Sequence, residues 1–190
     1  MNESPYSRST LMQALASVEA EVAAFFGSLS QDEFVLRVDS AWTPAQHLDH
    51  LNISVSAVAR GFSISRWLLR LRFGRARRVS RSYEQLRDDY RARLSAGGGA
   101  TGRYVPTVEE LPPEQRSVRQ QELLARWQRV NARLRAALER WSEKQLDRIQ
   151  LPHPLLGKLT AREMVFFTIY HNQHHVTGAK SRLPRFTKTT

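Results

Sequence analysis

The chain has 190 residues, a length that fits one compact domain with a sizeable core. It contains no cysteine, which excludes disulfides, thiolate metal sites and a cysteine nucleophile, so any metal must bind through nitrogen or oxygen. The first residues lack the basic-then-apolar order of a secretory signal, and no stretch approaches the ~20 apolar residues of a membrane span. We therefore expect a soluble cytoplasmic protein without membrane insertion.

The net charge of +11 is concentrated in two segments. Eight arginines and no acidic residue lie between Arg60 and Arg81, and four more basic residues follow Ala179. Elsewhere, basic and acidic residues nearly balance. This pattern supports a competing hypothesis, a basic module that binds nucleic acid or a membrane surface. Because the chain has no recognisable nucleic-acid-binding motif, we expect no specific nucleic-acid partner.

The first two predicted helices are amphipathic. Apolar residues from Leu11 to Leu29 recur every three or four positions, which predicts a helix with one buried stripe. A second helix is predicted to begin at Pro44, with Thr43 as its cap. Its first half should be buried, whereas beyond Trp67 it should become an arginine-rich surface helix.

A long crossover loop is predicted after the second helix, because residues 97–113 contain three consecutive glycines and three prolines. Loops of this length are uncommon unless they cover something functional. A third helix carries apolar residues from Leu124 to Trp141, and residues 151–157 form an extended connection. The last helix opens at Thr160 and runs through His175, with Glu163 completing a capping box. Four helices without a credible strand predict an all-α four-helix bundle.

Five of the six histidines fall in two clusters, His47 with His50 and His171 with His174 and His175. His171 and His175 are four residues apart, so on a helix their rings share one face and can bind one ion. A third ligand from the second helix would give a three-histidine site with one position open for water or substrate. The alternative is a hydrogen-bonded structural pair. The apolar run at residues 164–170 favours the metal, which would hold buried imidazoles neutral.

Two segments resemble a known family. Residues 42–51 (WTPAQHLDHL) and residues 153–175, from HPLLGKLT to YHNQHH, are similar to the second and last helices of the DinB/YfiT-like superfamily. The resemblance implies a DinB-like four-helix bundle over residues 1–179, followed by a basic tail at 180–190. It also implies that His50, His171 and His175 bind a divalent metal, zinc or nickel. Periodicity alone does not choose between His47 and His50.

The resemblance further implies a metal-dependent enzyme acting on a small molecule, either a hydrolase or a transferase that uses a low-molecular-weight thiol as cosubstrate. The substrate and the catalytic residues are not indicated. A metal-binding scaffold without turnover is the other alternative. We expect His153 to pack in a turn rather than line the site, and His174 to lie on the pocket rim or in a subunit contact. Trp127 and Trp141 suggest a stripe too wide for one core, which makes a homodimer plausible.

Overall fold

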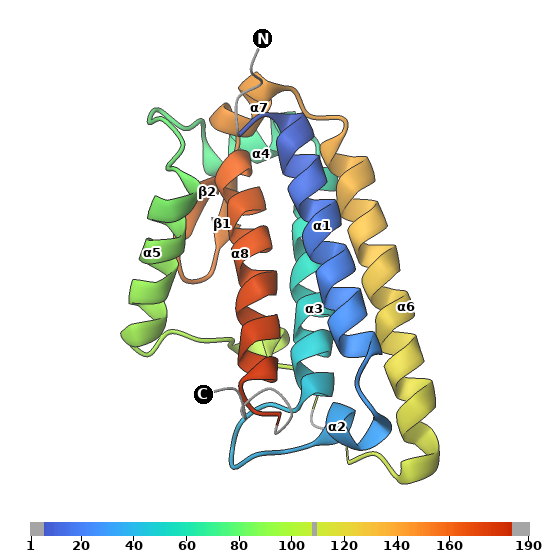
Figure 1. Cartoon of the computed structure of the whole chain (residues 1–190). Coiled ribbons are helices and arrows are strands. Elements are labelled where there is room, and N and C mark those ends of the chain that lie inside the picture. Colours follow the sequence, from blue (N-terminus) through green and yellow to red (C-terminus); the bar gives the residue numbers. More distant parts are fainter. Residues whose placement is uncertain (1–5, 108–109, 184–190) are drawn as a thin grey trace.

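The computed structural model describes residues 6–107 and 110–183, and it is mostly helical (Figure 1). Four long helices lie side by side: α1 (Arg8–Gly27), α3 (Pro44–Ser63), α6 (Pro113–Leu138) and α8 (Ala161–Lys180). Both α1 and α3 contact α6 and α8. No helix within these two ranges has the length and apolar character needed to cross a membrane.

Shorter elements connect the long helices. Helix α2 (Gln31–Val35) precedes α3, and α4 (Arg66–Phe73), α5 (Tyr83–Ser95) and the 3-10 helix η1 (Gly102–Tyr104) lie between α3 and α6. Helix α7 (Glu143–Arg148) and two strands, β1 (Gln150–His153) and β2 (Gly157–Thr160), lead into α8. In Figure 1, α5 and the two strands lie beside α8, and α4 lies at the same end of the long helices as α7.

Both helices that carry the histidine clusters begin where their local sequence predicts. The Thr43 side chain accepts from the Gln46 amide, and Pro44 occupies the first turn of α3. The Thr160 side chain likewise accepts from the Glu163 amide at the start of α8. Each cap pairs backbone donors that the helix itself leaves free, so the register of both helices is set from their first turn.

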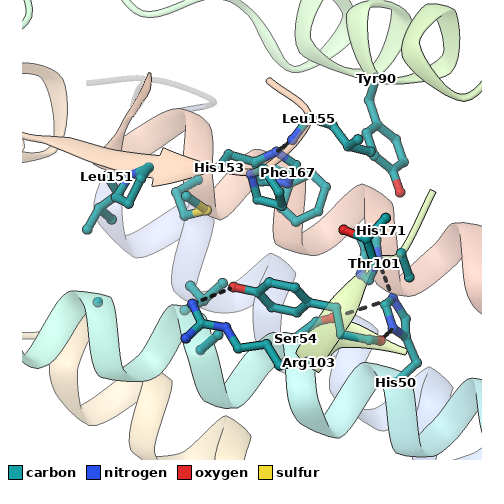
Figure 2. Close-up of a pocket in the computed structure, with 18 of the residues that line it drawn as sticks. His50, Ser54, Tyr90, Thr101, Arg103, Leu151, His153, Leu155, Phe167 and His171 are labelled. Carbon is teal, nitrogen blue, oxygen red and sulfur yellow. Dashed lines mark hydrogen bonds between the residues drawn. The ribbon is translucent and has the colours of Figure 1, made fainter. Parts of the chain in front are cut away.

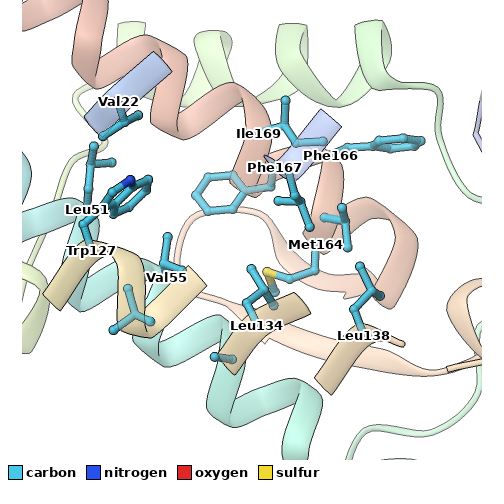
Figure 3. Packing of buried hydrophobic residues seen from close by; sticks show 14 of the residues in the cluster. Val22, Leu51, Val55, Trp127, Leu134, Leu138, Met164, Phe166, Phe167 and Ile169 are labelled. Carbon is cyan, nitrogen blue, oxygen red and sulfur yellow. The ribbon is translucent and has the colours of Figure 1, made fainter. Parts of the chain in front are cut away.

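The core runs along the facing sides of the four long helices, as Figure 3 shows for Val22, Leu51, Trp127 and Ile169. Trp127 and Trp141 are completely buried within the chain. Their indole nitrogens donate to the carbonyls of Glu19 and Phe62, both at 3.0 Å. These two tryptophans therefore contribute no exposed apolar surface for a second subunit, and the homodimer stays a prediction without that support.

The residues before α8 form a hairpin, although the sequence suggested no strand. Strands β1 and β2 pair antiparallel, with Gln150 opposite Thr160 and His153 opposite Gly157. Each strand has only four residues, too few to establish an alternating pattern, and Pro152 has no amide hydrogen to donate to a partner strand. Leu151 and His153 are buried on one face of β1, so the hairpin contributes a wall to the interior.

Two helix ends differ from expectation, and one further helix was not expected. The second helix ends at Ser63 and a separate helix, α4, follows it, while α5 was not predicted because it buries only Leu86 and Tyr90. Helix α6 ends at Leu138, before Trp141. Helix α8 ends at Lys180, and residues 184–190 of the expected tail lie outside the described residues.

Candidate metal centre

The structure brings His50, His171 and His175 together. His50 comes from the middle of α3, and the other two lie one turn apart on α8. The Nε2 atom of His171 lies 3.0 Å from Nε2 of His50 and 3.2 Å from Nε2 of His175. One ligand atom from each of the three lies within 4.8 Å of the others. His50 and His171 are each 4% exposed and His175 is 8% exposed.

The ring of His50 has a defined orientation. Its Nδ1 atom lies 2.7 Å from the backbone carbonyl of Tyr104, and a carbonyl can only accept a hydrogen bond. In the neutral ring, Nδ1 therefore carries the proton and Nε2 presents a lone pair to the other two histidines. Metal-binding histidines are commonly oriented by such a carbonyl partner.

His47 lies behind the cluster. Its Nδ1 atom is 2.9 Å from Nδ1 of His175, on the side of the His175 ring away from His171. When Nδ1 of His175 donates its proton to Nδ1 of His47, Nε2 of His175 carries the lone pair, and this lone pair faces His171. Trp42 stacks on His175 with ring planes 13° apart and also contacts the rings of His47 and His50.

These histidines are held neutral. Burial lowers the pKa of His171 and of His175 well below the ordinary value, and neighbouring imidazoles lower both further. Burial also lowers the pKa of His50, against the opposing effect of its hydrogen bond to Tyr104, and lowers that of His47 to about 3. Neutral imidazole is the form that binds metal ions.

The three side chains fit a divalent ion. Nitrogen ligands at about 2.0–2.1 Å from a tetrahedral ion lie roughly 3.3–3.4 Å apart, close to the separations within this cluster. The oriented Nε2 lone pair of His50 also faces Nε2 of His171, 3.0 Å away, where a shared cation would bind both atoms. Three nitrogen ligands leave one position of a tetrahedral ion open, the arrangement typical of catalytic rather than structural zinc.

The cluster lies in a cavity of about 510 Å³, within the range of small-molecule sites. Its walls come from α3, α4, α5, η1, β1 and α8, and most of the side chains that form them are apolar. None of the described lining residues is acidic, whereas Arg60 and Arg103 are both among them. Arg103 lies over the Tyr104 ring and donates to its hydroxyl at 3.4 Å.

Two hydroxyl groups accompany the histidines. Tyr90 on α5 is 6% exposed, and its hydroxyl points into the cavity on the side of His171 (Figure 2). The described residues offer it no hydrogen-bond partner, and burial raises its pKa to about 12, so it remains a proton donor. Ser54, one turn after His50, places its Oγ 3.4 Å from Nε2 of that histidine.

The remaining histidines have separate roles. Nδ1 of His153 accepts from the amides of Leu155 and Leu156, which supports the expected turn role, but the ring also lines the cavity and packs on Phe167. Burial lowers its pKa to about 4. His174 is half-buried and lines the cavity beside Tyr90, as expected for the pocket rim.

Glu163 does more than cap α8. It is completely buried, donates no proton, and accepts hydrogen bonds from the guanidinium groups of Arg78 and Arg81 and from the Arg81 amide. Burial alone would raise its pKa, but these donors outweigh that effect and lower the pKa to about 2. The ion pairs of Glu163 with Arg78 and Arg81 therefore connect the segment between α4 and α5 to the first turn of α8.

Sequence reasoning missed Trp42, Tyr90 and Tyr104 as parts of this site. Trp42 lies in segment 42–51, which carries the family resemblance, but nothing in that segment indicates that its ring packs on the histidines. Tyr90 depends on α5, whose docking against α8 is a tertiary effect. Tyr104 acts through its backbone carbonyl, which every residue possesses, so no side-chain pattern could have indicated it.

A family model, described as the DinB superfamily, matches residues 14–177. The match includes both histidine clusters and every long helix except the first residues of α1 and the last of α8. No curated protein and no solved structure gives a significant match to the chain.

Proposed function

The chain belongs to the DinB superfamily, and on this premise we propose that it is a metal-dependent enzyme acting on a small molecule. His50, His171 and His175 bind the metal, zinc or nickel. The observation that carries the proposal is the convergence of three neutral Nε2 atoms within a cavity large enough for a small organic substrate. The four long helices then form the DinB-type four-helix bundle, with the glycine- and proline-rich segment predicted after the second helix as its crossover loop, within one domain ending near residue 179.

A divalent ion with an open position is a Lewis acid that activates a bound water or thiol near neutral pH. Since the chain has no cysteine, any thiol must come from a cosubstrate of low molecular weight. The reaction class is therefore a thiol-dependent transfer or a hydrolysis.

The protein's own residues supply orientation and selectivity. The Tyr104 carbonyl and His47 hold two of the three imidazoles in place. The apolar walls exclude water and bind the body of the substrate. The Tyr90 hydroxyl donates a hydrogen bond to a polar group of the substrate next to the histidines, and Arg103 favours a neutral or anionic molecule over a cation.

Metal analysis and an activity screen test this proposal. Protein purified without chelator should contain close to one divalent ion per chain. A screen of low-molecular-weight thiols with electrophiles, and of ester and amide substrates, should detect turnover that chelator abolishes and added zinc or nickel restores. Thiol-modifying reagents should leave the protein itself unaffected. Turnover that continues unchanged in metal-free protein would refute the catalytic role, and bound metal with no turnover across the screen would favour a scaffold.

A further inference from the structure

Helix α4 exposes a face that is unusually apolar for a protein surface. Trp67 is 66% exposed, Leu68 49% and Leu71 71%, and Ile64 just before the helix is 42% exposed. Scattered apolar residues are ordinary on a surface, but a contiguous group of large ones marks an interaction site. No described part of the chain covers this group.

The helical geometry of α4 places these residues on one ridge. At about 100° per residue, Leu71 points roughly 160° away from Leu69, the side chain that α4 buries. Trp67 and Leu68 lie within about 60° of Leu71 on either side. An ordinary surface helix presents polar side chains to solvent. Helix α4 instead carries large apolar side chains on its solvent-facing side as well as on its buried side.

Arginines flank the ridge. Arg70 and Arg72 are exposed and lie about 100° from Leu71, one on each side. Arg75 and Arg77 follow and are also exposed, and the segment from Arg60 to Arg81 contains no acidic residue. None of the four arginines has a carboxylate partner among the described residues. An apolar ridge with cationic flanks characterises helices that lie in the plane of a membrane interface.

The charges decide which partner fits. A second copy of the chain, paired through the same ridge by a two-fold axis, would bring like-charged arginines together. Duplex nucleic acid would neutralise the arginines but would leave Leu68 and Leu71 without apolar contacts. An anionic lipid surface provides partners for the arginines and for the apolar ridge. Its headgroups pair with the arginines, while Trp67, Leu68 and Leu71 reach the acyl boundary.

We propose that the exposed face of α4, formed by Trp67, Leu68, Leu71 and the flanking Arg70 and Arg72, binds the surface of membranes that contain anionic lipids. The binding is peripheral. It is independent of the histidine cluster and of whether the protein turns over a substrate.

Vesicle cosedimentation tests the proposal. The chain should sediment with vesicles of phosphatidylcholine containing 30% phosphatidylglycerol and should stay in solution with pure phosphatidylcholine. Arg70→Gln with Arg72→Gln should weaken binding about 30-fold, since each basic residue near an anionic surface contributes roughly 1 kcal/mol. The matched control, Arg129→Gln with Arg133→Gln on α6, makes the same change in net charge at two exposed positions and should bind nearly as the parent does.

The apolar ridge has its own test. Trp67→Ser with Leu71→Ser should weaken vesicle binding by roughly tenfold or more, because apolar burial is lost. Val118→Ser, at a 57% exposed position on α6, should not. Circular dichroism confirms that each variant is folded. Equal binding by the two arginine pairs overturns the proposal. So does binding to pure phosphatidylcholine, a dimer that Leu71→Ser dissociates, or tighter binding to duplex DNA than to the anionic vesicles.

Discussion

At the residue scale, the contacts of His47 and His50 distinguish two neighbours that helical periodicity could not. Nε2 of His50 lies 3.0 Å from Nε2 of His171, whereas His47 approaches Nδ1 of His175, on the side of that ring away from His171. The family resemblance selected His50 as a ligand, and the geometry is consistent with that choice. The role that we assign to His47, as an orienting partner, rests on a contact between α3 and α8 and could not have been predicted from either segment alone.

Replacing the proposed ligands should therefore have graded effects on metal binding. His50→Ala, His171→Ala and His175→Ala should each remove most of the bound metal, because two imidazoles rarely hold a divalent ion. His47→Ala should retain the metal with an affinity lower by roughly 10- to 100-fold, as is usual for partners that orient a ligand. Inductively coupled plasma mass spectrometry and competition with a chelator measure both effects. Loss of metal in His47→Ala together with full retention in His50→Ala would contradict the assignment.

The hydroxyl of Tyr90 offers a second test at this scale. Since that hydroxyl has no partner among the described residues, Tyr90→Phe should change the free energy of unfolding by less than about 0.5 kcal/mol. If Tyr90 donates to the substrate, the same change should lower kcat/KM by about tenfold, the loss of one hydrogen bond of roughly 1.4 kcal/mol. Tyr83→Phe on the same helix, which removes a hydrogen bond to Gln173 outside the cavity, is the control for activity. Equal kcat/KM values for the parent and Tyr90→Phe would refute the hydrogen bond from Tyr90 to the substrate.

Acid should destabilise the metal-free chain. The buried histidines have pKa values below that of an unfolded chain, about 3 for His47 and about 4 for His153. Between those values and the ordinary pKa of about 6.5, the unfolded state binds more protons, so stability falls as the pH decreases through this window. Each such histidine contributes a slope approaching 1.4 kcal/mol per pH unit.

Urea unfolding between pH 7 and pH 5 measures that slope. His153→Asn keeps an acceptor for the amides of Leu155 and Leu156 but removes the titrating ring. The free energy of unfolding of this variant should therefore depend less steeply on pH, by the contribution of one histidine. Added zinc should shift the acid transition downward, because metal binding also favours neutral imidazole. A slope that is the same in parent and variant would show that His153 titrates normally.

At the scale of single elements, the caps were predictable and the hairpin was not. Thr43 and Thr160 act within three residues of themselves, so a short stretch of sequence contains the whole signal. Helix α5 and strand β1 are stabilised by packing against α8 and α4, contacts that no local pattern records. The separation of α3 from α4 at Ile64 has no glycine or proline at the break itself, since Gly61 lies within α3, and the helical spacing of apolar residues continues through Ile64 to Leu68.

The first turn of α8 should be a sensitive point for stability. Glu163→Gln leaves Arg78 and Arg81 without their buried carboxylate and should lower the free energy of unfolding by roughly 1.5–3 kcal/mol at pH 7. The depressed pKa means that this stabilisation is present above about pH 4.5 and is lost as the pH falls toward 2. Glu122→Gln, which removes an exposed pair with Arg119 at 3.5 Å, should cost less than about 0.5 kcal/mol. Equal losses of free energy of unfolding in the two variants would show that burial does not strengthen the ion pairs of Glu163.

At the scale of the whole molecule, the structure divides the arginine run that suggested nucleic-acid binding. Arg78 and Arg81 bind Glu163, and Arg66 donates to the Arg140 carbonyl and lies over the Trp141 ring. These three side chains stabilise the fold, whereas Arg70, Arg72, Arg75 and Arg77 remain exposed. A count of charges along the sequence could not separate the two groups, because the acceptors lie 74 to 85 residues away in the chain.

We accordingly expect only weak binding to DNA, with no preference for sequence. Contacts made only to phosphates depend on the release of counterions, so affinity should fall steeply between 50 and 200 mM salt. Fluorescence anisotropy with two unrelated duplexes measures both properties. A duplex bound tightly at physiological salt, or one preferred strongly over the other, would restore the nucleic-acid hypothesis.

Helix α4 has a second consequence, which concerns how a ligand reaches the cavity. Leu69 and Phe73 line the cavity, while Trp67 and Leu71 face outward from the same two turns. On a chain bound to a membrane through that outer face, the cavity lies about one helix diameter, 10–12 Å, from the lipid. An apolar ligand dissolved in the bilayer would then be delivered by lateral diffusion and partitioning. Its effective concentration would be its mole fraction in the lipid, and apparent KM values would scale with the amount of lipid rather than with the volume of water.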